Sequence, residues 1–312
     1  NISANYLLVS TFSINDNSQV NIEAVLGAGN TVYMSHSALY IIQPFYRYYN
    51  VRPVEILPDQ STSDAEIFAD DFEIKEGTIL LKFNLIDKGV KFEVAGQVPG
   101  QILNQYSLDE FNGYIRIATT SRNNNWIPSN NLYVLDKGLK VTGKIENLAP
   151  TERIYAVRFM GKTGYVVTFR DVDPLFVIDL SVPANPTVTG ELKIPGFSNY
   201  LHPVSDTLLL GIGNHVVDNR TAGVKVSLFD VSNPFKPIET DYAIFGGLGS
   251  SSQAQYNPRA FVWWKTRTMA LFPVTLSGKD GSTDYSNYET TRSGAIALTV
   301  NERDNKIFEL AR

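Results

Sequence analysis

The sequence has no cysteine among its 312 residues, and only 19% of its residues are charged. Without thiols, neither a disulfide framework nor a metal site built on sulfur is possible. No apolar run approaches the roughly 18 to 20 residues that a membrane-spanning helix needs, so we expect no transmembrane segment in this chain. Lysine and arginine form no basic run, and the net charge of -5 argues against nucleic-acid partners.

Motifs of known catalytic chemistry are also missing. There is no GxSxG elbow, no P-loop and no GxGxxG. The three histidines, His36, His202 and His215, have no spacing typical of a metal site, and we expect a structural role for His202. These absences favour a protein that is not an enzyme.

The sequence does contain a repeat. FVIDLSVPANPTVTGELKIPG, at Phe176–Gly196, returns as SLFDVSNPFKPIETDYAIFG, which ends at Gly247. Five residues recur about 51 positions apart: Asp179 as Asp230, Ser181 as Ser232, Pro183 as Pro234, Pro186 as Pro237, and Gly196 as Gly247. Each copy predicts a strand, an Asp-x-Ser-x-Pro turn and a second strand. Such a turn, repeated near every 50 residues, is typical of β-propeller blades.

The whole chain, 1–312, is therefore predicted to be a single all-β propeller domain. Strand patterns indicate about five four-stranded blades, at 31–98, 101–146, 153–194, 200–245 and 259–310. Tyr6–Ile14 and Val20–Leu26 resemble the outer half of a further blade. Because open strand edges invite aggregation, we expect the ring to be closed by segments outside this chain. The recurrence of Asp136, Asp179 and Asp230 at strand ends predicts Asx turns at the blade corners.

The candidate binding residues are aromatic. An insertion loop at 44–77 is expected inside the first full blade, and loops of this length are either functional or mobile. It contributes Tyr46, Tyr48 and Tyr49. Trp126, on an Asn-rich hairpin, either contacts a protein or glycan or folds back over the sheet rim.

Two aspartate pairs are candidate Ca²⁺ ligands, and no other cofactor is expected. Asp171 and Asp173 stand two apart in RDVDP, where turn formation before a proline is the alternative. Asp280 and Asp284, in KDGSTDYSN, resemble a calcium loop but lack the full EF-hand pattern. Asn219, in Asn-Arg-Thr, is a candidate acceptor for N-linked glycan.

Several segments together carry a family resemblance: TVYMSHSALYI (Thr31–Ile41), GQVPGQILNQYSLDEFNGYIRIATT (Gly96–Thr120), NNLYVLD (Asn130–Asp136), Leu148–Pro186, GELKIPGFSNYLHP (Gly190–Pro203) and VSLFDVSNP (Val226–Pro234). On them the chain resembles secreted archaeal and bacterial proteins with a C-terminal β-propeller distantly related to WD40 repeats. The resemblance implies secretion or attachment to the cell surface, and it supplies no established catalytic residues. The sequence departs from the family at Asn257, Pro258 and Arg259, where members often have an acidic residue and a histidine.

The sequence therefore favours an extracellular or cell-surface propeller that serves as an interaction or structural module. Its partners would be proteins or glycans of the surface, a missing partner segment, or further copies of the chain. One alternative is a secreted hydrolase or lyase with its site at the channel mouth, where Asp109, Glu110 or Glu152 would supply carboxylates. Another is a repeating subunit of a surface filament or layer.

Overall fold

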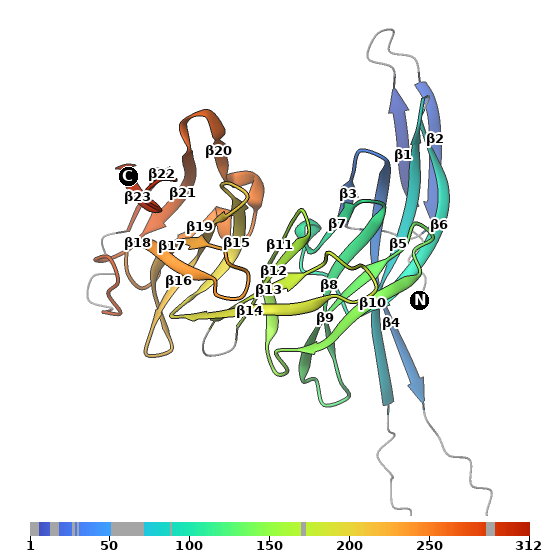
Figure 1. Ribbon diagram of the computed structural model, residues 1–312, viewed down its shortest axis with the longest axis horizontal. Coiled ribbons are helices and arrows are strands. Elements are labelled where there is room, and N and C mark those ends of the chain that lie inside the picture. The colour runs from blue at the N-terminus through green and yellow to red at the C-terminus, as the bar shows by residue number, and fades with distance from the viewer. Residues whose placement is uncertain are drawn as a thin grey trace, which may run out of the picture.

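A computed structural model of the chain describes residues 6–12, 19–26, 29, 31–50, 72–87, 89–169, 173–284 and 291–312. Over these residues the protein is nearly all β, and its only helices are short 3₁₀ turns. Figure 1 shows the sheets following one another in chain order around an arc. None of the helices in this part of the chain has the length and apolarity needed to cross a bilayer. The predicted all-β propeller fold is confirmed.

Five antiparallel sheets form the blades, and each keeps its strands in chain order. Blade 1 consists of β3 (Thr31–Met34), β4 (Ala38–Asn50), β5 (Phe72–Ile86) and β6 (Gly89–Pro99). Blade 2 consists of β7 (Leu108–Phe111), β8 (Tyr114–Arg122), β9 (Pro128–Leu135) and β10 (Val141–Leu148). Blade 3 consists of β11 (Arg153–Met160), β12 (Thr163–Phe169), β13 (Asp173–Asp179) and β14 (Thr187–Ile194).

Blade 4 consists of β15 (Phe197–Pro203), β16 (Leu208–Val217), β17 (Arg220–Asp230) and β18 (Ile238–Phe245). Blade 5 has five strands, because β19 (Ser251–Ser252) and β20 (Val262–Trp264) both pair with β21 (Met269–Leu276). It ends with β22 (Arg292–Asn301) and β23 (Lys306–Ala311). A separate hairpin of β1 (Tyr6–Phe12) and β2 (Gln19–Leu26) packs Leu7, Val9 and Val25 against the buried Ile41, Phe83 and Val90 of blade 1.

One local prediction was wrong. Residues 44–50 and 72–77 do not belong to a loop, because they continue the β4–β5 ladder from Pro44 opposite Thr78 to Asn50 opposite Phe72. The remainder of that predicted insertion, 51–71, lies outside the described residues. Blade 2 was predicted to run from Gln101, whose backbone pairs with Thr120 in an isolated bridge, and its first strand begins at Leu108. Between the two, a capping box between Asn104 and Ser107 turns the chain through the 3₁₀ turn η1 (Gln105–Ser107).

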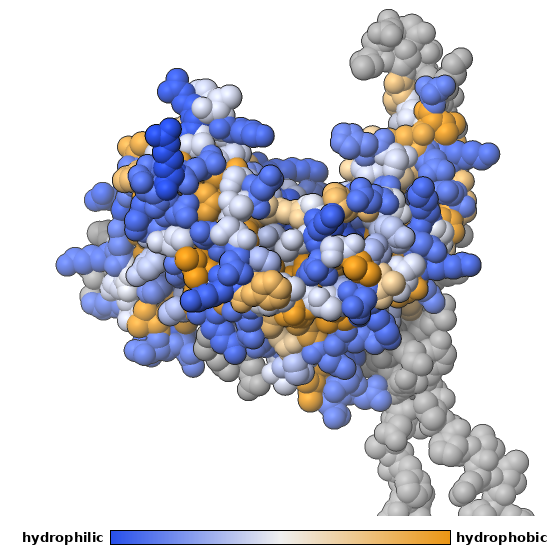
Figure 2. All heavy atoms as spheres, viewed as in Figure 1, coloured by the Kyte–Doolittle hydropathy of each residue, from blue (hydrophilic) through white to orange (hydrophobic). Residues whose placement is uncertain are grey.

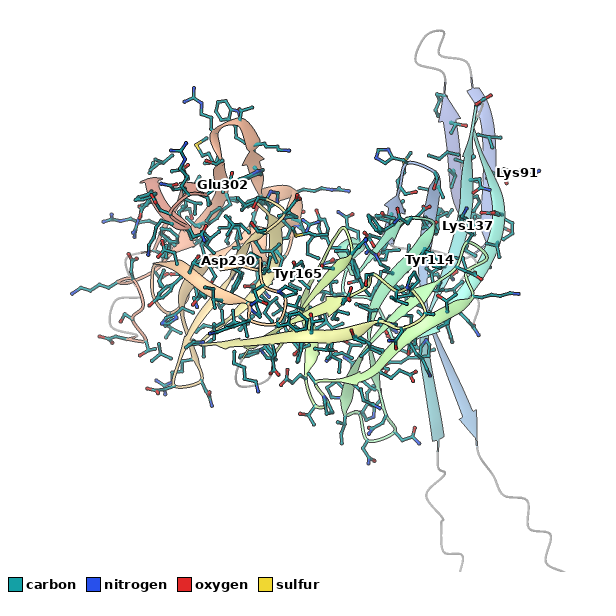
Figure 3. The ribbon with its side chains drawn as sticks, in the orientation of Figure 1. Lys91, Tyr114, Lys137, Tyr165, Asp230 and Glu302 are labelled. Carbon is teal, nitrogen blue, oxygen red and sulfur yellow. The ribbon has the colours of Figure 1, made fainter. Side chains whose placement is uncertain are left out.

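The hydrophobic core lies between successive blades. Separate clusters of buried apolar residues join blades 1 and 2, 2 and 3, 3 and 4, and 4 and 5. Figure 3, in which Asp230 is labelled at a corner of blade 4, shows side chains filling the spaces between the sheets. Burial of this apolar surface holds neighbouring blades together, at roughly 25 cal/mol for each Å² removed from water.

The repeated turn forms a corner of blade 3 and the equivalent corner of blade 4. The carboxylate of Asp179 accepts the backbone N–H of Ser181 at 2.8 Å, and that of Asp230 accepts the N–H of Ser232 at 2.9 Å. The predicted Asx turns are therefore present at both positions. Asp136 accepts an N–H four residues on, from Lys140, so the corner of blade 2 has a different span.

Each corner also rests on the preceding blade. Pro183 and Pro186 of blade 3 lie against Gly143 of β10, where a Cβ atom would overlap the Pro183 carbonyl oxygen. Pro234 of blade 4 lies against Gly190 of β14 in the same way. A close approach of two backbones requires glycine here, which explains a glycine in the outer strand of each of these blades.

Candidate functional site

The predicted aromatic residues lie on the β4–β5 ladder of blade 1 and on the β8–β9 turn of blade 2. Tyr46 stands on β4 opposite Glu76 and is 53% exposed. Tyr48 and Tyr49 lie further along the same strand, and their side chains are outside the described residues. The carboxylate of Glu76 lies 3.6 Å from the guanidinium of Arg122, at the end of β8, so this ion pair joins the two blades at this edge.

Trp126 projects from the β8–β9 turn with 63% of its surface exposed, so it does not fold back over the rim. The turn is held by Asn123, whose side-chain oxygen accepts the backbone N–H groups of Asn125 and Ile127, both at 3.0 Å. Trp126 itself has a φ of 61°, in the left-handed region, and donates its N–H to the Asn123 carbonyl at 2.9 Å. A large apolar side chain is thus presented to solvent on a hydrogen-bonded turn.

The aspartates proposed for Ca²⁺ do not converge in the part of the chain that the structure describes. Asp171 lies outside the described residues, and Asp173 pairs through its backbone with Ile194. Asp280 is bound by both Nη atoms of Arg312, at 2.9 to 3.0 Å, and by the N–H of Gly246. Asp284 donates its N–H to Ser282. Over the described ranges, no three acidic or histidine residues are arranged so that they could hold a metal ion, and Ca²⁺ binding stays a prediction.

Asn219, the candidate glycan acceptor, lies in the two-residue turn between β16 and β17. Asp218 and Asn219 have φ values of 47° and 60°, as a type I′ hairpin turn requires. Both residues are exposed, so the carboxamide of Asn219 is open to solvent. Glycosylation there is compatible with the fold and stays a prediction.

The three carboxylates considered for catalysis all have partners within the protein. Glu110 accepts hydrogen bonds from Ser35, Ser37 and Tyr40 at 2.6 to 3.0 Å. Burial alone would raise the pKa of Glu110, but these hydrogen bonds outweigh it and lower the pKa. Glu152 accepts a hydrogen bond from the hydroxyl of Thr168.

Asp109 is held more tightly than the other two. Arg116 donates to both of its carboxylate oxygens, with Nε 2.6 Å from Oδ1. Burial raises the pKa of Asp109, although the hydrogen bonds and charge of Arg116 oppose the rise. The ion pair, in which Arg116 is buried and Asp109 is partly exposed, therefore fixes β7 against β8.

A second cluster, which no sequence pattern predicted as a whole, lies where the first strands of the blades converge. We call it the axial cluster: Tyr106 of η1, Arg158 of β11, Tyr200 and His202 of β15, Phe261, and Trp263 of β20. The rings of Tyr106 and Tyr200 lie 5.7 Å apart, and the Arg158 guanidinium lies 4.4 Å from the centre of the Tyr106 ring. His202 packs on Phe261 and Trp263 at 4.8 and 5.2 Å.

The polar atoms of the axial cluster form a short chain. The Tyr200 hydroxyl lies 3.3 Å from Nη2 of Arg158 and 3.1 Å from Nδ1 of His202. Burial, helped by the charge of Arg158, lowers the pKa of His202 to about 4, so its imidazole is neutral at physiological pH. Its Nε2 atom is buried without a hydrogen-bond partner in the described part of the protein. The one signal in the sequence was the alternation in SNYLHP, which places Tyr200 and His202 on one face of a strand.

A cavity of about 400 Å³ adjoins this cluster. Its walls come from β3, η1, β7 and β11, and they include Tyr106, Asp109 and Arg158. On the open side of the arc, Figure 2 shows the surface hollowed between the lobe that carries β20 and the lobe that carries β3. The cavity thus lies where blades 1, 2 and 3 meet, and its walls come from residues between 32 and 159.

A family model described as the beta propeller domain matches residues 1–309. The chain belongs to this beta propeller family. An uncharacterized protein of Archaeoglobus fulgidus is 50% identical to it over 211 residues, which are 66% of this chain and 32% of that protein. An uncharacterized protein of Methanocaldococcus jannaschii is 42% identical over 203 residues, which are 64% of this chain and 31% of that protein. The chain matches about a third of the length of these archaeal relatives.

Among solved structures, the propeller is similar to the periplasmic gluconolactonase PpgL of Pseudomonas aeruginosa. The two superpose with a TM-score of 0.51 over 98% of this chain and 82% of the gluconolactonase, at 11% sequence identity. A likeness at that identity concerns the fold alone.

Proposed function

We propose that this propeller is an interaction and structural module that acts outside the cell or attached to its surface. The observation that carries the proposal is the exposure of Tyr46 and Trp126 on adjacent blades whose edges the Arg122–Glu76 ion pair joins. Exposed tyrosine and tryptophan on an ordered backbone are typical of contact surfaces, because their rings bury much area at little cost in conformational entropy.

The partner is a glycan or a protein of the cell envelope. The Trp126 turn is rich in asparagine, and asparagine amides suit hydrogen bonds to sugar hydroxyls or to peptide groups. The low fraction of charged residues supports a contact made through aromatic and neutral polar groups rather than through ion pairs. Secretion is supported by the family resemblance of the sequence.

The test measures binding of the full-length native protein to isolated cell envelopes of its own organism. Replacing Tyr46 and Trp126 together by alanine should weaken that binding at least tenfold. The matched control is Phe235→Ala in the corner of blade 4, where the side chain is 73% exposed, and it should leave binding unchanged. Equal binding by the double variant and the wild type would refute the proposal.

A second candidate, a repeating subunit or a ring completed by further sheets, is supported by the uncovered face of blade 5. Val262, Trp264, Leu271 and Phe308 point to the same side of this sheet and are 40% to 54% exposed. The opposite face of the sheet packs against blade 4. Apolar patches of this kind mark surfaces that another protein layer covers.

Introducing charge on that face separates the second candidate from the first. Trp264→Glu should abolish self-assembly of the native protein in light scattering, while binding to envelopes through Tyr46 and Trp126 persists. If the wild type shows no assembly, and protein carrying Trp264→Glu has the same mass and stability, the face has no covering layer.

A further inference from the structure

Arg158 is a half-buried cation without a carboxylate partner among the described residues. Its Nε donates to the carbonyl oxygen of Leu201 at 3.0 Å, and its Nη2 reaches the Tyr200 hydroxyl at 3.3 Å. The rings of Tyr106 and Tyr200 lie against its guanidinium, with centroids 4.4 and 5.6 Å away. These contacts orient the guanidinium but supply no negative charge.

The cavity beside Arg158 offers room for the missing charge. Its volume of about 400 Å³ falls within the range of pockets that hold small molecules. Tyr106, Phe159 and Leu108 give it aromatic and apolar walls, and Val32 and Met34 of β3 stand at its side with 47% and 62% of their surfaces exposed. The site therefore combines one cationic group with a lining suited to a ring.

The other charged group in the wall, Asp109, does not neutralise Arg158. Both of its carboxylate oxygens are engaged by Arg116, and that pair is neutral as a unit. Its carboxylate nevertheless opposes a ligand with two negative charges more than a ligand with one. The planar fork of a guanidinium also matches the planar oxygens of a carboxylate.

We propose that this axial cavity binds a small organic monocarboxylate with a ring-shaped body. The carboxylate bonds to Nη1 of Arg158, for which no partner is found in the described ranges. The ring packs on Tyr106 and Phe159. Binding places a counter-charge beside a cation that is otherwise partly removed from water, which is the source of selectivity for an anion.

The test is a calorimetric titration of the full-length native protein with two probes, benzoate and glucuronate. Benzyl alcohol and glucose serve as their neutral counterparts. At least one carboxylate should bind with a dissociation constant in the millimolar range or below, and at least tenfold more tightly than its neutral counterpart. Absence of binding by both carboxylates, or equal binding by the neutral compounds, overturns the proposal.

Two variants locate the site. Arg158→Lys keeps the charge but loses the fork, and it should weaken binding at least tenfold. Because Arg158 also supports Leu201, Met34→Trp provides an independent variant that fills the cavity from β3 without touching Arg158. It should weaken binding to the same extent, while Phe235→Ala, on the outer side of blade 4, should not. Undiminished binding by protein with Met34→Trp would place the ligand elsewhere and overturn the assignment.

An NMR measurement distinguishes binding in this cavity from binding at the surface that carries Tyr46 and Trp126. Bound carboxylate reduces the positive field of Arg158 at His202, so the imidazole pKa of His202 should rise on binding when followed by NMR. An unchanged pKa in the presence of saturating probe would overturn the placement beside Arg158. Replacement of Tyr46 and Trp126 should not affect the calorimetric titration with carboxylates. The cavity proposal and the envelope-binding proposal can therefore fail independently of each other.

Discussion

Arg116 of blade 2 donates a hydrogen bond to the carbonyl oxygen of Gly161 in blade 3. Its side chain is 2% exposed, and its guanidinium lies 4.8 Å from the ring centre of Phe111 and 5.1 Å from that of Phe159. Together with the paired Asp109, it makes a polar connection through an otherwise apolar interface between blades.

Replacing Arg116 by methionine should destabilise the protein by about 3 kcal/mol, because the partly buried Asp109 and the Gly161 carbonyl lose their partner. The free energy of unfolding in urea measures the effect. Adding Asp109→Asn to the variant should recover part of the loss, since the unpaired charge is removed. Arg303→Met, at an exposed turn before β23, is the control and should change stability by less than about 0.5 kcal/mol.

Gly190→Ala should destabilise the protein by about 2 kcal/mol, because the new Cβ would overlap the carbonyl oxygen of Pro234 in the next blade. Gly294→Ala is the matched control on β22, where a Cβ atom would have no neighbour within 4 Å. That substitution should be neutral or slightly stabilising, since alanine restricts the unfolded chain. Equal effects of the two substitutions would show that the corner does not depend on close backbone contact.

The buried, neutral state of His202 should make stability fall in mild acid. Its pKa in the folded protein is lowered to about 4, from an ordinary value of 6.5, so the unfolded chain takes up the proton first. The stabilisation is present above pH 6.5 and is lost as the pH falls toward 4, by on the order of 2 kcal/mol once partial exposure is allowed for.

Urea unfolding at a series of pH values follows this loss. His202→Gln should flatten the dependence, and His36→Gln, at the exposed β3–β4 turn, should leave it as in the wild type. Burial lowers the pKa of His215 as well, so a smaller dependence of the same sign should remain in His202→Gln. A pH profile unaltered by His202→Gln would contradict the assignment.

Asp179→Ala should cost about 1 kcal/mol, the ordinary net value of a hydrogen bond, and Asp230→Ala somewhat more, because its carboxylate also accepts a hydrogen bond from Asn305 of blade 5 at 3.3 Å. Because the two corners belong to different blades, the effects should add in the double variant. Asparagine at either position keeps an acceptor oxygen and should retain most of the stability. Thermal or urea unfolding gives the comparison, and strong non-additivity would mean that the corners are coupled.

The corners were predictable because their hydrogen bonds are local. Asp179 and Ser181 are two residues apart, so the turn is visible in the sequence and its recurrence at Asp230 reveals the blades. The start of β7 was not, because it depends on the capping box at Asn104. The extended β4–β5 ladder was mistaken for a loop because Pro44 and the acidic residues of 64–76 were given more weight than the alternation of Phe72 and Ile74 with Glu73 and Lys75.

The axial cluster was out of reach for a different reason. Tyr106, Arg158 and Phe261 come from three blades, and only the curvature of the arc brings them together. Their separations in the sequence carry no period that could be recognised. Of the proposed contact residues, Tyr46 and Trp126 were identified because aromatic side chains on polar segments are locally conspicuous.

The docking of each corner on the glycine of the blade before it gives the arc a direction. Neighbouring blades meet through unlike surfaces, so the two outermost sheets present different faces to whatever adjoins them. A partner that extends the arc must make a heterologous, head-to-tail contact. A two-fold arrangement would bring identical faces together, and the proline turn would then meet no glycine strand of the kind it packs against between blades. The polarity set by a proline turn thus restricts which symmetries are open to an assembly of these propellers.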